Sequence, residues 1–393
     1  MTILIVGAGV AGPTLAYWLR RAGHDVTLVE RASELRRGGY VIDFWGAGFE
    51  VADRMGVLPE ILRRGYRIGE VRQVNDAGRT FAAFRADVFF RATGGRYVSI
   101  PRGDLASILY DALDDRVERI FGDTVRALDD DGTRVRVTFE QGAPREFDLV
   151  VGADGQHSSI RRLVFGPEAQ FETFLGITVA AFDVEGYRPR DELVYVLHTE
   201  VGRQIARFAM DGDRTMFLLT FRDDGRAATE DDEAQRSVLR ARMAGAGWET
   251  SRILAHLSEA RTFYFDRVSQ IRMPSWTRGR VALVGDAAAC VSLLAGQGTA
   301  LAMVESYVLA AELSRARGDH REAFSGYERM LMPFLRSKQE AAVRLAPAFA
   351  PKSRAQLFFI KSITKLMGLP LVANLAMGKS VRDAIELPPP PGE

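Results

Sequence analysis

The first thirty residues alternate between short apolar runs and one segment of helical period. Thr2 to Val6 is an apolar run, glycines follow at once, and Pro13 to Ala22 has the pattern of a helix that ends at Gly23. A second apolar run, Val26 to Val29, leads to Glu30. This order predicts a parallel βαβ unit, in which the right-handed crossover places the start of the helix beside the end of the first strand.

The rest of the chain switches between buried-type strands, helices and stretches of strict alternation. Alternation between turns in residues 66–101 and 171–272 predicts an antiparallel sheet. Within the second stretch the expected strands are Val179 to Val184, Leu193 to Leu197, Gln204 to Met210 and Thr215 to Phe221. We therefore predict an α/β fold with an α+β substrate layer. A Rossmann-like domain (1–65, 102–170 and 273–320) would be interleaved with an antiparallel-sheet substrate domain (66–101 and 171–272), and helices with a frayed tail would follow in 321–393.

The glycines of the first turn have the spacing of a dinucleotide-binding motif. Gly7 permits the tight turn, Gly9 lets the backbone approach a pyrophosphate, and Gly12 allows close packing of helix on strand. Glu30, at the end of the second strand, is placed to accept hydrogen bonds from the hydroxyls of an adenosine ribose. The unit predicts a dinucleotide but does not distinguish NAD from FAD.

Two later motifs also follow buried strands and precede helices. The first contains Asp154-Gly155, with Ser158 as a candidate cap for the following helix, and the second contains Gly285-Asp286. The second leads through Gly296-Gln297-Gly298 into a long predicted helix, whose first backbone amides could face a developing anion. Each motif alone is equally consistent with an ordinary strand-to-helix turn.

Composition narrows the class of protein. Over 393 residues, 47% are apolar and 26% charged, and the formal net charge is +1, so we expect a globular protein with no nucleic-acid partner. The single cysteine, Cys290, excludes an internal disulfide and favours the cytoplasm. We find no signal for a metal site and no apolar run of the ~20 residues needed to span a bilayer, so we expect no integral membrane association.

Taken in order and at these separations, the three motifs resemble those of the single-component (group A) FAD-dependent monooxygenases of the para-hydroxybenzoate hydroxylase fold. Gly38-Gly39 and Ala295-Gly296-Gln297-Gly298 are most similar to tetracycline-inactivating and polyketide-tailoring members. The resemblance implies that NAD(P)H reduces FAD and that a flavin C4a-hydroperoxide, formed with O2, hydroxylates a hydrophobic phenolic or enolic, polyketide-like metabolite. NADPH and NADH remain open, because no second GxGxxG unit is present to bind either permanently.

The resemblance also implies cofactor roles for individual residues. It places the adenosine ribose at Glu30, the adenine at Arg31, and the phosphate and ribityl side of the flavin at Arg102. Asp154 would lie near the pyrophosphate and the visiting NAD(P)H, and Asp286 would bind the ribityl hydroxyls. The backbone amides of Gly296 to Gly298 would bind the isoalloxazine carbonyls. No catalytic side chain is implied, since the cofactor carries the chemistry. The loop with Leu293 and Gln297 would lie beside the reactive flavin carbon.

The substrate is expected between the second sheet and the flavin. Candidate contacts are the aromatic residues and the one arginine on the predicted strands: Phe182, Tyr195, Arg207, Phe217 and Phe221. Leu293 stands where many relatives have proline, which predicts a looser loop and leaves open an alternative function, a FAD-scaffolded non-redox cyclase. A halogenase is disfavoured because its WxWxIP motif is absent. The apolar stretch after Phe358 should pack on the FAD domain or roof the substrate site, and either a monomer or a homodimer is compatible with the sequence.

Overall fold

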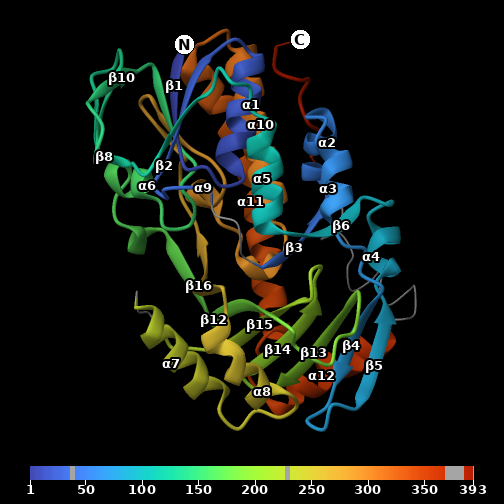
Figure 1. Ribbon diagram of the computed structural model, residues 1–393. Helices are drawn as coiled ribbons and strands as arrows, with labels where there is room; N and C mark the ends of the chain where they lie inside the picture. Colours follow the sequence, from blue (N-terminus) through green and yellow to red (C-terminus); the bar gives the residue numbers. More distant parts are fainter. Residues whose placement is uncertain (36–39, 226–230, 368–384, 393) are drawn as a thin grey trace.

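The computed structural model describes residues 1–35, 40–225, 231–367 and 385–392, and Figure 1 shows two sheets joined by long helices. The first is a six-stranded sheet in the order β17-β18-β11-β1-β2-β7. Its strands are β17 (Thr277–Arg278), β18 (Val281–Leu283), β11 (Leu149–Gly152), β1 (Thr2–Val6), β2 (Asp25–Glu30) and β7 (Glu118–Phe121). All pairs are parallel except β17 with β18, and the predicted βαβ unit is confirmed as β1, α1 (Ala11–Arg21) and β2.

The second sheet is seven-stranded, in the order β16-β12-β15-β14-β13-β4-β5. Its strands are β16 (Thr262–Ile271), β12 (Glu172–Glu185), β15 (Arg214–Arg222), β14 (Arg203–Ala209), β13 (Val194–Glu200), β4 (Glu70–Val74) and β5 (Thr80–Arg85). The four strands expected between residues 179 and 221 are confirmed, and β12 is much longer than the alternation indicated. The pairs are antiparallel except β13 with β4, where the earlier segment joins the sheet edge.

Two small sheets and the helices complete the fold. The pair β3 (Val41–Trp45) and β6 (Tyr97–Pro101) connects the large sheets, and β8 (Val125–Asp130), β9 (Val135–Phe139) and β10 (Arg145–Phe147) form a three-stranded sheet. The remaining helices are α2 (Ala47–Arg54), α3 (Leu58–Arg64), α4 (Asp87–Ala92), α5 (Arg102–Asp111), α6 (Ser159–Val164), α7 (Asp232–Met243), α8 (Thr250–Ala255), α9 (Asp286–Ala289), α10 (Gly298–Arg315), α11 (His320–Leu345) and α12 (Arg354–Leu366).

The seven-stranded sheet has two differently covered faces. One face, here called the outer face, packs under α7 and α8, which Figure 1 shows on the side away from β1 and β2. The other, the inner face, packs against the β3–β6 pair near β13 and β14, and against Leu294 and Ala346 near β12 and β16. Because alternate side chains of a strand point to opposite faces, neighbouring residues of β15 belong to different environments.

The C-terminal region differs in part from the prediction. Helix α12 packs mainly against β5 at the edge of the seven-stranded sheet and leaves Phe358 (74% exposed) and Phe359 (63%) outside, while Met367 at its end joins an apolar cluster with Trp45 of β3. A role of α12 as a roof of the substrate site stays a prediction. The Pro388 carbonyl accepts hydrogen bonds from Arg54 and from the Tyr307 hydroxyl, each at 2.7 Å, and Leu387 is buried. The prediction of a frayed tail is therefore wrong for residues 385–392. Within the described residues, none of the helices has both the length and the apolar character of a membrane span.

Candidate active site

All three motifs meet at one edge of the six-stranded sheet. Val6 of β1 lies opposite Val29 of β2 and Gly152 of β11, and Gly152 in turn lies opposite Leu283 of β18. The carboxyl ends of the four parallel strands are thus level, and the glycine turn, Glu30, Asp154 and Asp286 all follow them. Ligands of open parallel sheets bind in the crevice beyond these strand ends. The motifs that are far apart in the sequence therefore form one site.

The glycine turn has the close approaches that its motif predicts. A Cβ on Gly7, at φ +109°, would lie 2.5 Å from the Ala153 oxygen, and a Cβ on Gly12 would lie 1.9 Å from the Gly7 oxygen. Helix α1 has no side-chain cap at its N-terminus and no acidic residue in its first turn. Its first amides and the positive end of its dipole are therefore left for an anion, which fits the pyrophosphate of FAD.

Glu30 holds the glycine turn while keeping capacity for a ligand. Its Oε2 accepts a hydrogen bond from the Ala8 amide at 2.8 Å, and its Oε1 accepts one from the Ala32 amide at 2.9 Å. Each carboxylate oxygen has a second lone pair, so the arrangement is compatible with the ribose role, which stays a prediction. Arg31 is exposed at the rim, as a residue beside an adenine would be.

Arg102 lies between the glycine turn and Asp286. One of its terminal nitrogens is 3.9 Å from the position that a Cβ on Gly9 would take, and its charge acts on Asp286, Tyr40 and Tyr264. The guanidinium makes no hydrogen bond or ion pair with any described residue, whereas the Arg102 backbone amide donates to the Tyr40 carbonyl at 3.0 Å. A positive charge that is exposed at this edge and has no partner among the described side chains fits the phosphate and ribityl side of FAD.

Asp154 accepts hydrogen bonds from the start of α6. Its Oδ2 accepts hydrogen bonds from the Ser159 amide (2.7 Å), the Ser159 hydroxyl (2.9 Å) and the Ile160 amide (3.2 Å), and its Oδ1 accepts one from Ser158. The carboxylate thus caps α6, and its role at the pyrophosphate stays a prediction. The predicted cap at Ser158 is confirmed, since its hydroxyl accepts from the Arg161 amide at 2.9 Å.

Arg161 joins the second motif to the third. Its fully buried guanidinium donates to the Ala287 carbonyl at 3.1 Å, to the Gln156 carbonyl and to Glu168 Oε2 at 2.6 Å. The sequence marked Arg161 only as part of a motif, because the acceptor that links it to the third motif, Ala287, is 126 residues away along the chain. In the structure it fixes α9, and with it Asp286, relative to the end of β11.

Asp286 is partly enclosed at the start of α9. Desolvation raises its pKa, and the Arg102 charge opposes that rise. The preceding amide, of Gly285 at φ +64°, donates to Oε2 of the buried Glu305 at 2.8 Å. Desolvation and the charge of Asp286 raise the pKa of Glu305 well above its usual range. Glu305 is a positioning group that the sequence analysis missed, although an acidic residue inside the apolar run of α10 is a usable signal.

The loop before α10 is closed without a proline. The Ala295 amide donates to the Ser292 carbonyl and the Gly296 amide to the Leu293 carbonyl, while Leu293 packs against the buried inner-face cluster that includes Leu294 and Ala346. These contacts fix one conformation of the loop, and the looser loop expected from Leu293 stays a prediction. Position 298, the first of α10, lies beside Asp286: a Cβ there would be 3.7 Å from Asp286 Oδ1. Leu301 is the first residue of α10 whose amide donates to a carbonyl of the same helix end, that of Gln297. The amides before it have no partner within the helix, and they lie at the end of α10 that meets this site. Gln297, next to them, is buried.

Four of the five predicted substrate contacts belong to the outer face. Phe182, Phe217 and Phe221 pack with residues of α7 and α8, and Arg207 pairs with Glu249 (2.6 Å) and Asp191. Their prediction as substrate contacts is wrong, because alternation shows that a strand has two faces but not which face meets the cofactor. Tyr195 lies on the inner face beside Phe208.

Tyr40 and Tyr264 are inner residues near the cofactor edge that the sequence did not indicate. Their ring centroids are 5.3 Å apart, and desolvation raises the pKa of Tyr40 to about 12 and that of Tyr264 well above its usual range. Both keep some exposed surface. They come from segments more than 200 residues apart, so only the fold brings them together. Gly38-Gly39, just before Tyr40, lies outside the described residues.

His157 forms a bridge between the cofactor motifs and the seven-stranded sheet. Its Nδ1 lies 2.9 Å from Glu168 Oε1, and its Nε2 lies 3.3 Å from both oxygens of Asp266 on β16. These two hydrogen bonds, that to Asp266 first, raise the pKa of His157 to about 10. An imidazolium is therefore held at neutral pH at the junction of the two sheets.

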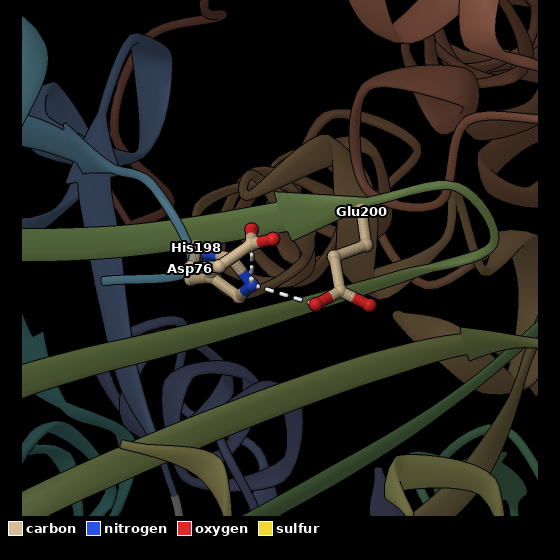
Figure 2. A group of neighbouring side chains, drawn as sticks. All are labelled: Asp76, His198 and Glu200. Atoms are coloured by element: carbon tan, nitrogen blue, oxygen red, sulfur yellow. Dashed lines mark hydrogen bonds and ion pairs between the residues drawn. The ribbon is translucent and has the colours of Figure 1, made fainter. Parts of the chain in front are cut away.

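A second histidine cluster lies on the outer face, far from the motifs. Figure 2 shows His198 with Nε2 directed toward Glu200 Oε1 (2.9 Å) and Asp76 Oδ1 (3.8 Å). Glu200 also accepts hydrogen bonds from the Gly247 amide (2.7 Å) and from Arg203 (2.8 Å), and His198 Nδ1 lies 3.2 Å from the Val74 carbonyl. Arg203 balances the charge of Glu200, so these contacts explain the cluster as an ion-paired network at the sheet edge.

Two surface hollows, of about 330 and 940 Å³, lie along α11 and next to β17. They are lined by residues such as Trp276, Arg321 and Arg336, and neither includes the glycine turn, Arg102 or Asp286. The cofactor edge is therefore identified by the motifs and their contacts and not by the size of a hollow.

Comparison with known proteins supports the cofactor assignment. Residues 1–324 match the family model described as FAD binding domain. A protein of Mycobacterium tuberculosis is 42% identical over 358 residues, covering 89% of this chain and 95% of its own length. A flavin-dependent monooxygenase from an unknown prokaryotic organism is 35% identical over 388 residues, covering 98% of both chains. The crystal structure of tetracycline destructase Tet(55) superimposes with a TM-score of 0.84 at 32% identity, over 98% of each chain. The chain thus belongs to the FAD binding domain family and is a FAD-dependent monooxygenase.

Proposed function

We propose that this enzyme uses NADPH or NADH and O2 to hydroxylate a hydrophobic phenolic or enolic, polyketide-like metabolite by the oxygen-transfer route predicted above. The observation that carries the proposal is the position of the cofactor edge opposite the inner face of the seven-stranded sheet. Residues of that face pack with Leu294 of the loop before α10. A substrate held against the inner face would therefore lie next to the flavin. The similarity to a tetracycline destructase supports a polycyclic substrate.

FAD, when bound, would supply the electron transfer and the activation of O2, and the protein would supply binding and orientation. Glu30 and the α1 amides would hold the adenosine and pyrophosphate, Arg102 and Asp286 the ribityl side, and the α10 amides the pyrimidine end of the ring. The positive end of the α10 dipole would stabilise negative charge on the reduced flavin. The inner face would exclude water through its apolar side chains. We also propose the division into cofactor and substrate domains at the boundaries given above.

The test is oxidation of NADPH and NADH by the FAD-loaded enzyme with a panel of polycyclic phenols that includes tetracycline. We expect at least one compound to accelerate NAD(P)H oxidation and to yield a product heavier by one oxygen atom. Anaerobic stopped-flow absorbance would then show whether the compound accelerates flavin reduction. If no panel member is oxygenated, and the flavin resists both nicotinamides, the hydroxylase proposal fails.

The cyclase alternative stays a second candidate. It rests on a loop loosened by Leu293, and the turn within the loop and the packing of Leu293 against the inner-face cluster favour the hydroxylase instead. The alternative predicts conversion of a polyene precursor with unreduced flavin, so the same stopped-flow experiment separates the two functions.

A further inference from the structure

Asp43 presents one unpaired carboxyl oxygen near the inner face. It lies on β3 directly opposite Ser99 of β6. Its Oδ1 accepts hydrogen bonds from the Tyr97 hydroxyl at 2.7 Å and the Ser99 hydroxyl at 2.6 Å. Its Oδ2 has no hydrogen-bond partner among the described residues. The two hydroxyls therefore fix the orientation of the carboxyl group and leave Oδ2 for another donor.

The side of β3 that carries Asp43 faces the seven-stranded sheet. Val41, two residues earlier and hence on the same side of the strand, packs with Phe208, Met216 and Tyr195 of the inner face. The Val41 amide lies 3.0 Å from the sulfur of Met216. Ile42, on the opposite side, belongs to the core of the first domain. Asp43 is thus directed between β3 and the inner face.

The surroundings of Asp43 are those of a ligand-contacting group. Desolvation raises its pKa despite the two donated hydrogen bonds, and desolvation together with the charge of Asp43 raises the pKa of Tyr195 well above its usual range. Both side chains nevertheless keep accessible surface. A carboxyl oxygen that is held in place, is accessible and is not used by the described donors of the protein is suited to accept a hydrogen bond from a ligand.

We propose that Asp43 Oδ2, beside Tyr195, is the acceptor for a hydroxyl hydrogen of the substrate, so that the enzyme selects molecules carrying a phenolic or enolic O–H. The inference rests on the proposed function, because it places the substrate on the inner face. A substrate whose hydroxyl is methylated cannot donate to Oδ2 and leaves this oxygen unpaired. A site built for a donor rejects such analogues more strongly than an apolar pocket does.

The test compares two probes on the oxidised, FAD-loaded enzyme: 2-naphthol, which donates a hydrogen bond, and 2-methoxynaphthalene, which cannot. Binding is followed by the change in flavin absorbance without NAD(P)H, so no turnover is needed. We expect the wild type to bind 2-naphthol at least about tenfold more tightly, as one hydrogen bond to a carboxylate provides. Asp43→Asn keeps the Oδ1 acceptor for Tyr97 and Ser99 but replaces Oδ2 with an N–H donor. Its preference should disappear or reverse.

Matched controls separate this role from a structural one. Asp87→Asn changes a partly exposed aspartate on α4 that pairs with Arg91, and it should keep the wild-type preference. A general loss of stability in Asp43→Asn would weaken both probes equally and leave their ratio unchanged. An unchanged ratio, or a wild type that does not bind 2-naphthol more tightly than its methyl ether, overturns the inference. Failure of the proposed function is distinct, because it would appear as absent oxygenation whichever probe binds.

Discussion

Adjacent residues of β15, Phe217 and Leu218, test the assignment of the two sheet faces. Phe217 is fully buried on the outer face, with ring centroids 5.2 Å from Phe182 and 4.9 Å from Tyr187. Replacing such a residue by alanine removes its burial and leaves a cavity, at a cost of about 3–5 kcal/mol. If the chain of 393 residues unfolds as one unit, its unfolding entropy is ~2.1 cal/mol/K per residue. Divided by that entropy, the lost free energy corresponds to a fall in Tm of about 4–6 °C.

Leu218 is only partly buried and lies on the inner face, opposite Ala181 and Ala206. Leu218→Ala should therefore cost only about 1–2 kcal/mol of folding free energy. It should raise the Kd for 2-naphthol about fivefold, since about 1 kcal/mol of apolar contact with the ligand is lost. Phe217→Ala should leave that Kd unchanged. Differential scanning fluorimetry and flavin-absorbance titration measure the two effects. If Phe217→Ala weakened the probe and Leu218→Ala did not, the faces would be assigned in reverse.

Three further predictions concern the cofactor edge and its supports. Asp286→Ala should weaken FAD binding by roughly 10- to 100-fold, as for a lost hydrogen bond to a charged group, and full FAD retention after gel filtration would refute the ribityl assignment. His157→Gln should remove a stabilisation of the fold that depends on pH, because folding raises the pKa of His157 to about 10. This stabilisation is complete below pH 6.5 and is lost as the pH rises toward about 10. Plots of Tm against pH for variant and wild type should therefore converge by pH 10. Deleting residues 387–393 should cost about 2–4 kcal/mol through the buried Leu387 and the two bonds to Pro388, and an unchanged Tm would contradict the observed packing.

The cofactor edge was predictable because its signals are local. A glycine that must approach another backbone, such as Gly12 against Gly7, is visible as a glycine at fixed spacing after an apolar run. The topology of parallel strands then requires that segments following Val6, Gly152 and Leu283 meet at one edge. The roles of single side chains were less predictable. Asp154 has the expected place and also caps α6, a second use of the carboxylate that the motif did not indicate.

The substrate face was not predictable, for a reason that lies in the period of a strand. Alternation assigns Phe217 and Leu218 to opposite sides, but an aromatic side chain packs as well under α7 and α8 as it would against a ligand. The larger, more aromatic set on β12 and β15 turned out to fill the outer core. A face that must leave room for a ligand has less need of large side chains than one that must be filled.

That distinction explains why the inner face carries the polar features argued for above. A core between a sheet and two helices must be packed without unpaired polar groups, and on the outer face Arg207 meets this requirement through two carboxylates. The inner face near β3 is not closed in this way, since Asp43 and Tyr195 both stay partly exposed. Tyr97 and Ser99 hold Asp43 through Oδ1, and Oδ2 has no partner among the described residues. A hydroxylated substrate on the inner face would complete the hydrogen bonding of this carboxyl group.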